Sequence, residues 1–525
     1  MKINIKYKLF AALIVAAVAV AGFSGPMASA HRGRNDQGAI KWGNCPVYNP
    51  EKRLKCGTLQ VPLDYKNPTG KTITIAVSKL EATKPSLRQG VLLLNPGGPG
   101  GPGLDMPLWM SQIMPKSVVE RYDLIGFDPR GVAFSAPVTC GLNAVEGSQI
   151  APPMEQPGGF YETAFFMARA AVGCALHSGK SLPHMTTANT ARDMDRIRQS
   201  LGERKISYFG YSYGSYLGAV YATLFPQNTQ RFVLDSATTY KGEWREVFRS
   251  WGLADEARFP DLAQYLIDHK DQYNFGSTQK EVRETFFRLL NKLEKNPITT
   301  EFGDFTAAMF RVYTFSGLYS DDYFEDTALI WQFVDEQPIT SATASLEKAV
   351  RLKTEFPRVP QDNSGASANA VLCDDFAWPR SIEQYRKELQ ADTQRYPMFG
   401  SIGSHIWPCA FWPTQPIEPP VVASKNGPSR KIMIVQNTKD PATPYRYGQE
   451  MRAALGDRAR LVTVEQGGHG ASYGAINACA QDVVTKYLIG GALPGDTTCT
   501  EEYSVFAKKT DAARNAMREL HRRMW

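Results

Sequence analysis

A serine between two glycines is the first feature of this sequence whose spacing suggests chemistry. Residues 210–214 are GYSYG and fit the pattern G-x-S-x-G, in which the serine lies on a tight strand-to-helix turn and projects its hydroxyl from the sheet edge. The pattern alone is weak, because Gly and Ser are common. Its context strengthens it, since residues 206–209 form an apolar strand-like run and residues 215–225 continue with helical character. We therefore predict that Ser212 is the nucleophile of an acyl-transfer reaction, in preference to a glycine-rich turn without chemistry.

Such a serine needs an acid and a histidine, which follow it in that order along the chain. Asp440 comes shortly after the strand-like residues 431–435, and His469 lies in a glycine-rich loop after residues 459–464. Asp440 would hold the correct tautomer of His469 and stabilise its charged form, while His469 removes the proton of Ser212.

Each of these two residues has a rival. Asp457 precedes the strand at residues 459–464, which places it at the opposite end of the sheet, and His521 lies in a charged C-terminal stretch that is typical of a solvated helix. An aspartate before a proline can also simply begin a turn. The joint placement of Asp440 and His469 after neighbouring strands favours the catalytic interpretation.

A glycine-rich loop follows the apolar residues 90–95 and suits the stabilisation of an oxyanion. Residues 95–100 are NPGGPG, and glycine lets the backbone approach a substrate closely. We expect the N–H groups of Gly98 and Tyr213 to form the oxyanion hole.

The same loop also matches a dinucleotide-binding fingerprint, because Gly98, Gly100 and Gly103 have the spacing G-x-G-x-x-G after a strand. Pro99 and Pro102 remove N–H groups that should face a pyrophosphate, and we expect a third proline, at position 107, to interrupt the required helix. We therefore interpret the fingerprint as a chance match and expect no cofactor.

Strand and helix signals alternate over most of the chain. Strands separated by helical segments imply βαβ units and a mostly parallel sheet, whereas residues 241–427 give amphipathic helical segments with few strand signals. The predicted fold class is α/β, with core residues 31–240, a large, mainly helical cap at 241–427, and core residues 428–525. The predicted strands are residues 72–77, 90–95, 122–128, 206–209, 232–235, 431–435 and 459–464, and the predicted helices include 187–201, 280–293 and 343–353.

The first thirty residues have the character of a secretory signal peptide. Three lysines precede the apolar residues 9–23, and Ala28-Ser29-Ala30 supplies the small residues of a cleavage site. The apolar run is shorter than the roughly 20 residues that span a bilayer, so an uncleaved anchor is the weaker alternative. We expect a secreted protein that is cleaved near Ala30 and has no stable membrane association.

Charge argues against a nucleic-acid partner. The chain has 59 Lys+Arg and 52 Asp+Glu, a net charge of +7, and loss of the three leader lysines lowers this to +4. Such a mild excess without a basic run does not indicate nucleic-acid binding.

All eight cysteines follow the leader, and an even number in an exported chain predicts disulfides. No CxxC motif occurs and histidines do not cluster near the cysteines, so we expect no metal site. Eight cysteines allow 105 pairings, which sequence alone does not separate. Their grouping into four local pairs makes neighbour pairing the simplest hypothesis: Cys45–Cys56, Cys140–Cys174, Cys373–Cys409 and Cys479–Cys499.

Several further motifs stand out: NPGGPG at 95–100, DPRG at 128–131, TANTARD at 187–193, residues 210–218, DPATP at 440–444, and GGALP at 490–494 with Cys499. Together they resemble the secreted tripeptidyl aminopeptidases, bacterial serine exopeptidases related to proline iminopeptidase. The resemblance implies an α/β-hydrolase core, a helical cap and release of short peptides from substrates with a free N-terminus. Similar proteins include esterases and amidases, so a secreted carboxylesterase or amidase with the same triad is the alternative. Proline iminopeptidases usually have His where this chain has Asn95, which disfavours release of single prolines.

An aminopeptidase must recognise a substrate ammonium, and a cap carboxylate is its natural partner. Cys373-Asp374-Asp375 resembles the family's Cys-x-Asp segment, which makes Asp375 the first candidate and Asp374 the second. Two acids on a solvated loop are an equally simple interpretation. Trp407 and Trp412 flank Cys409, and we expect them to pack within the cap rather than line the substrate pocket.

Overall fold

The computed structural model describes residues 40–500, apart from 48–51, 151–152, 157, 301–302, 337–358 and 475–476. These residues belong to one compact unit. The predicted leader, the predicted helix 343–353 and His521 lie outside the described residues. No helix in the described part of the chain is long and apolar enough to cross a membrane.

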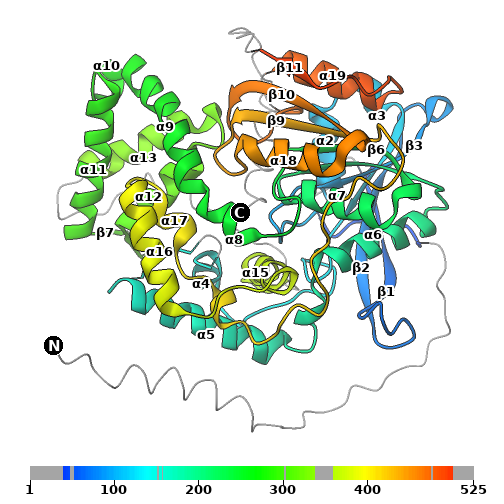
Figure 1. Ribbon diagram of the computed structural model, residues 1–525, viewed down its shortest axis with the longest axis horizontal. Helices are drawn as coiled ribbons and strands as arrows, with labels where there is room; N and C mark the ends of the chain where they lie inside the picture. The colour runs from blue at the N-terminus through cyan, green and yellow to red at the C-terminus, as the bar shows by residue number, and fades with distance from the viewer. Residues whose placement is uncertain are drawn as a thin grey trace. The chain divides into compact units, whose positions relative to one another are not determined.

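A nine-stranded sheet forms the centre of this unit (Figure 1). Its order is β1-β2-β4-β3-β5-β6-β9-β10-β11; β2 pairs antiparallel with β1 and β4, and the remaining pairs are parallel. The mostly parallel sheet predicted from the sequence is therefore confirmed, and the architecture is that of an α/β hydrolase. The strands are β1 (Lys55–Pro62), β2 (Thr72–Leu80), β3 (Gly90–Asn95), β4 (Tyr122–Phe127), β5 (Ile206–Tyr211), β6 (Thr229–Asp235), β9 (Ile432–Lys439), β10 (Ala459–Gly467) and β11 (Thr497–Cys499).

Strands in the middle of the sheet are apolar along their length because both faces are covered. Along β3, Val91 and Leu93 belong to one apolar cluster, and Leu92 and Leu94 belong to another. The first cluster includes residues of α6 (Thr187–Ser200), α7 (Tyr213–Leu224) and α18 (Tyr445–Leu455); the second includes residues of α2 (Met106–Ile113), α3 (Lys116–Val119) and α19 (Ala478–Leu488).

One expectation in this region was wrong. Pro107 does not interrupt a helix, because it occupies the first turn of α2, where the missing N–H has no intrahelical acceptor to lose.

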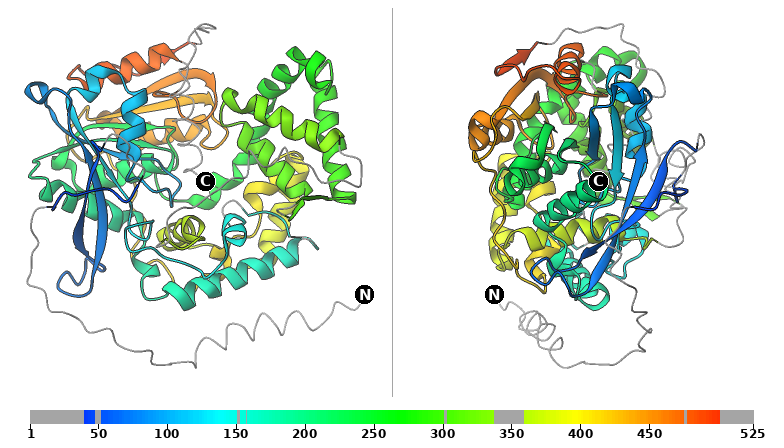
Figure 2. Two further views of the ribbon diagram at one scale, coloured as in Figure 1. Left: turned by 180° about the vertical axis from the view of Figure 1, so that it is seen from behind. Right: turned by 90° about the vertical axis from the view of Figure 1, so that its right-hand side faces the viewer.

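The chain between β6 and β9 is mainly helical, and Figure 2 shows these helices beside the sheet. Buried aromatic rings hold the layer together; Trp331 packs against Phe259, Phe286 and Phe310. The helices are α8 (Trp244–Arg249), α9 (Trp251–Asp268), α10 (Lys270–Tyr273), α11 (Gln279–Lys295), α12 (Ala307–Gly317), α13 (Phe324–Glu336), α15 (Asn363–Asp375), α16 (Ile382–Arg395) and α17 (Gly400–Ser404), with a hairpin of β7 (Ile298–Thr300) and β8 (Gly303–Phe305).

Part of the range 31–240, which we expected in the core, packs against this insertion. Helices α4 (Ala144–Ser148) and α5 (Phe160–Ser178) lie along α15 and the short helix η6 (Pro408–Phe411). Asp362, just before α15, accepts hydrogen bonds from the N–H groups of Cys140 and Leu142 at 2.8 and 3.1 Å. The helical layer is thus built from two separate parts of the sequence.

The eight cysteines form four disulfides, and each joins the neighbours expected from the sequence. Two of them tie helices of the helical layer to nearby segments, and the others secure β1 and β11 near the sheet edges. Each closes a loop short enough to contribute roughly 3 kcal/mol in the chain-entropy model. The bonds are Cys45–Cys56, Cys140–Cys174, Cys373–Cys409 and Cys479–Cys499.

Candidate active site

Ser212 lies on the turn between the last residue of β5 and the first residue of α7. Its backbone has φ 55° and ψ −124°, a conformation that costs a residue with a side chain about 1–3 kcal/mol. Its N–H donates to the carbonyl of Asp235 at 3.0 Å, which fixes the turn against β6. The strained turn is the local structure that G-x-S-x-G predicts.

Glycines are required where other backbone crowds this turn. A Cβ on Gly97 would lie 2.7 Å from the Tyr211 carbonyl oxygen and 3.0 Å from the Ser212 Cβ. A Cβ on Gly214 would lie 2.7 Å from the amide oxygen of Asn95. The loop after β3 can therefore approach Ser212 only because both positions lack side chains.

His469 and Asp440 are brought together by neighbouring parallel strands. Asp440 follows β9 directly, His469 follows β10, and Lys439 pairs with Gly467 across the two strands. The His469 Nδ1 lies 2.9 and 3.0 Å from the two carboxylate oxygens of Asp440. Both side chains are buried, so the imidazole has a fixed orientation with Nδ1 toward the acid.

The Asp440 carboxylate also organises its own loop. It accepts the N–H groups of Ala442 and Thr443 at 2.9 and 2.8 Å and the Thr443 hydroxyl at 3.0 Å. Asp440 therefore does both things considered from the sequence: it stabilises the turn that follows it, and it contacts His469. These donors orient the carboxylate toward the imidazole.

Two residues at the end of β6 hold the loop that carries His469, and sequence reasoning missed both. Asp235 accepts the N–H groups of Ala471 and Ser472 at 2.7 and 2.9 Å, as well as the Ser472 hydroxyl. The Ser236 hydroxyl accepts the Gly470 N–H at 2.8 Å. Burial raises the pKa of Asp235 to about 6. In the sequence, the sign of this role was an acidic residue, Asp235, at the end of an apolar strand.

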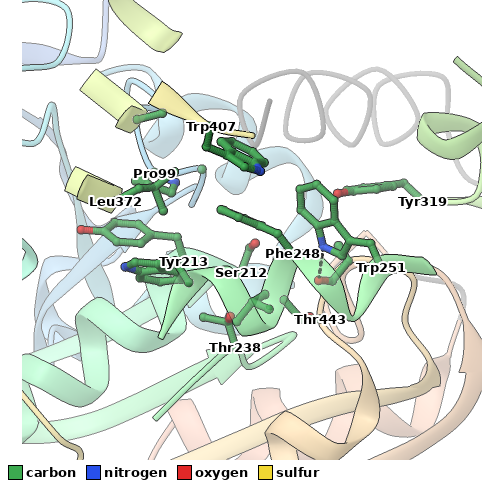
Figure 3. Close-up of a pocket in the computed structure, with 15 residues that line it drawn as sticks. Pro99, Ser212, Tyr213, Thr238, Phe248, Trp251, Tyr319, Leu372, Trp407 and Thr443 are labelled. Carbon is green, nitrogen blue, oxygen red and sulfur yellow. Dashed lines mark hydrogen bonds between the residues drawn. The ribbon is translucent and has the colours of Figure 1, made fainter. Parts of the chain in front are cut away.

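Ser212 borders a cavity with mainly apolar walls (Figure 3). Two of the lining residues also contact the His469 ring: Tyr319 packs edge to face with ring centroids 5.1 Å apart, and the Thr443 hydroxyl lies 3.4 Å from Nδ1. The cavity that exposes Ser212 is thus adjacent to the Asp440–His469 pair. Its lining consists of Gly98, Pro99, Ser212, Tyr213, Thr238, Trp244, Val247, Phe248, Trp251, Tyr319, Ala368, Leu372, Trp407, Ala442 and Thr443.

Both residues expected in the oxyanion hole border this cavity beside Ser212. Gly98 lies in the loop after β3, and Tyr213 is the first residue of α7. The N–H of a first helical residue has no intrahelical acceptor. Two segments that are distant in the sequence therefore meet at the cavity beside Ser212.

Asp374 and Asp375 are placed differently from either expectation. Both are buried at the end of α15, so the interpretation as a solvated loop was wrong, and neither lines the cavity. Asp375 accepts the Thr187 N–H at 2.7 Å, the Thr187 hydroxyl at 2.5 Å and the Trp244 indole N–H at 3.3 Å. Asp374 accepts the Trp412 indole N–H at 2.9 Å and a threonine hydroxyl at 2.6 Å.

Burial is the main cause that raises the pKa of Asp375 to about 6 and that of Asp374 to about 7. The expected packing role fits Trp412, which bonds Asp374, whereas Trp407 both packs within the cap and lines the cavity. Trp407 borders the cavity and stacks on Phe248 with ring centroids 4.4 Å apart.

The sequence is similar to those of known hydrolases over most of its length. Residues 396–499 match the family model described as TAP-like protein. The chain is 34% identical over 485 residues to the tripeptidyl aminopeptidase of Streptomyces coelicolor, which covers 89% of this chain and 87% of the relative. The chain belongs to the tripeptidyl aminopeptidase-like family. It is a serine hydrolase of the peptidase type.

Other members of this tripeptidyl aminopeptidase-like family are similar over nearly the whole chain. Serine protease Hip1 of Mycobacterium tuberculosis is 30% identical over 519 residues, which cover 92% of this chain and 94% of the relative. Carboxylesterase B of the same organism is 30% identical over 486 residues, with 86% and 88% covered. The resemblance seen in the motifs is confirmed, and the family includes proteins named for peptide and for ester hydrolysis.

Proposed function

We propose that this protein is a secreted exopeptidase that releases short peptides, of three residues, from free N-termini through an acyl-enzyme on Ser212. The observation that carries the proposal is the Asp440–His469 pair beside the cavity that exposes Ser212 on its strained turn. The similarity to a tripeptidyl aminopeptidase over 89% of the chain supports the substrate class.

In the proposed mechanism, the Ser212 hydroxyl attacks the scissile carbonyl carbon while His469 takes its proton at Nε2. Asp440 keeps the other ring proton on Nδ1 and stabilises the imidazolium. The N–H groups of Gly98 and Tyr213 donate to the oxyanion. His469 then gives its proton to the leaving amine as the C–N bond breaks, and a water molecule, activated by the same imidazole, releases the peptide from Ser212. These steps require no metal or cofactor.

In the proposed complex, the cavity walls around Ser212 contact the substrate residue that precedes the scissile bond and so determine which side chains fit there. Val247, Phe248 and Leu372 offer hydrocarbon surface, and Trp244 and Trp407 offer aromatic faces. A charged side chain would lose its hydration there without a partner. We therefore expect an uncharged residue at the acyl side of the bond.

Export is part of the proposal. The chain begins with the features of a signal peptide, and four disulfides suit a protein that folds outside the reducing cytosol. Sequencing the N-terminus of protein recovered from culture medium tests this, and a mature chain that begins near residue 31 is the expected result.

A substrate panel tests the activity itself. We expect tripeptidyl chromogenic amides to be cleaved faster than aminoacyl or dipeptidyl amides, and N-acetylation to lower kcat/KM sharply. Equal rates on N-acetylated and free substrates, together with faster cleavage of short esters, would instead support a secreted carboxylesterase or amidase with the same triad.

A further inference from the structure

Asp255 is a buried carboxyl group that the proposed mechanism does not use. It lies in the second turn of α9, its side chain has no exposed surface, and neither carboxylate oxygen has a hydrogen-bond partner among the described residues. A buried carboxyl without a partner costs stability. A residue of this kind close to a reactive cavity is a candidate for function.

The contacts of α9 place Asp255 near the catalytic loops. Four residues earlier, Trp251 lines the cavity and donates its indole N–H to the Ala442 carbonyl at 2.9 Å. Three residues later, Arg258 packs so closely on Gly467 that a Cβ there would lie 2.2 Å from a guanidinium nitrogen. Residues separated by three and four positions share one helix face, so Asp255 faces the loops after β9 and β10.

Among the described residues, the charges that shift the pKa of Asp255 are negative. Asp440 and Glu256 add negative charge, and burial, the largest cause, raises the pKa of Asp255 well above its usual value. Burial raises the pKa of Tyr319, which packs on His469, and the negative charge of Asp255 adds to this effect. The cation on the same helix face, Arg258, pairs with Asp261 and Asp321.

We propose that Asp255 receives the α-ammonium group of the peptide substrate. This inference rests on the proposed exopeptidase function. An ammonium offers three N–H donors and a positive charge, which match two carboxylate oxygens without donors in an acidic environment. Asp374 and Asp375 already accept donors at both oxygens.

Asp255 lies about one helical turn from Trp251, which lines the cavity with Ser212. Three extended residues span about 10 Å, and the rise along α9 from Trp251 to Asp255 is about 6 Å. Asp255 does not itself line the cavity in this conformation. Substrate binding therefore requires the Trp251 or Tyr319 side chain to move aside.

Binding of an ammonium must be coupled to the ionisation of Asp255. The carboxyl group is neutral at low pH and must lose its proton to pair with the cation. KM for a free-amine substrate should therefore depend on pH, because Asp255 must be ionised and the substrate ammonium, whose pKa is near 8 in a free peptide, must be protonated. KM for the N-acetyl substrate should lack this dependence. Asp440, Glu256, His469, Tyr319 and the paired Arg258 are the charged or titratable groups around this site.

The test compares Asp255→Asn with Asp268→Asn, an exposed position on the same helix, and with the rival Asp375→Asn. Each variant is assayed on a tripeptidyl anilide, its N-acetyl form and a short ester over a range of pH. Asp255→Asn should raise KM for the free-amine substrate at least 30-fold, leave the other two substrates within a few fold, and abolish the pH dependence of KM. Asp268→Asn should match the wild type.

Equal losses on all three substrates with Asp255→Asn would overturn the proposal, as would a selective loss with Asp375→Asn alone. If Asp255→Asn melts well below the wild type, Asp255→Ser provides the same comparison. Indifference of the wild-type enzyme to N-acetylation would be a different result, because it would reject the exopeptidase function itself.

Discussion

Replacing Asp440 with Asn should nearly abolish turnover and leave the fold intact. The asparagine side chain keeps an oxygen that can accept the N–H groups of Ala442 and Thr443, so the turn retains its hydrogen bonds. Its amide N–H₂ then replaces the oxygen that lies 2.9 Å from the His469 Nδ1. The amide N–H₂ donates to Nδ1 and so favours the imidazole tautomer with its proton on Nε2, whereas the retained oxygen, 3.0 Å from Nδ1, already accepts two backbone N–H groups.

The expected loss follows from that change of tautomer. An imidazole protonated on Nε2 cannot take the proton of Ser212, and the imidazolium loses its buried counter-charge. In a comparable triad the same substitution lowers kcat on the order of 10⁴-fold, which corresponds to about 5 kcal/mol of transition-state stabilisation. KM should change little, since Asp440 does not line the cavity.

Steady-state kinetics on a tripeptidyl anilide and a short ester, together with thermal melting, check this prediction. Asp457→Asn is the matched control, because that carboxylate is 89% exposed at the other end of the sheet. A loss smaller than tenfold, with the melting temperature unchanged, would show that Asp440 does not orient the base.

Three further predictions concern the nucleophile, the disulfides and the pH dependence of stability. Ser212→Ala should lower kcat on the order of a million-fold, and an organophosphonate should label Ser212 alone; labelling at another serine would reject the assignment. Peptide mapping without reduction should recover the four neighbour disulfides, and a bridge between two of these pairs would contradict the structure. Asp374 is neutral in the folded chain up to its pKa of about 7, whereas it ionises near 4 when unfolded. Stability should therefore fall as pH rises from about 4 to about 7, by at most a few kcal/mol. Asp374→Asn should reduce the difference in melting temperature between pH 5 and pH 8, and an unchanged difference would argue against a buried neutral acid.

The sheet and the residues that follow its strands could be predicted because periodicity and chain order determine them. Buried parallel strands are continuous apolar runs, and loops after neighbouring strands must meet at one edge. This is why Asp440 and His469 could be paired from sequence and found at hydrogen-bond distance. β1 and β11 were missed because they lie at the sheet edges, where one side has no neighbouring strand and the apolar pattern is weaker.

The sequence predicted the helical layer only as a segment rich in helices. Its packing could not be predicted, because its contacts join residues that are far apart in the chain. Nothing in the local sequence indicates that Asp362 holds the backbone near Cys140, or that Asp375 is saturated by Thr187 and Trp244. A carboxylate that binds substrate and one that binds the protein's own donors look alike in sequence. Only the positions of the donors distinguish Asp375 from Asp255.

The inserted helices line the cavity and also support the loops that carry Asp440 and His469, the proposed acid and base. Trp251 donates to the Ala442 carbonyl, two residues after Asp440. The Tyr319 carbonyl accepts the His469 N–H at 2.8 Å, and the Tyr319 ring packs on the imidazole. A movement of α9 that opened the cavity would break a hydrogen bond to the loop of the acid. Opening for substrate and alignment of the Asp440–His469 pair should therefore be coupled, so that substitutions of Trp251 or Tyr319 change kcat as well as KM.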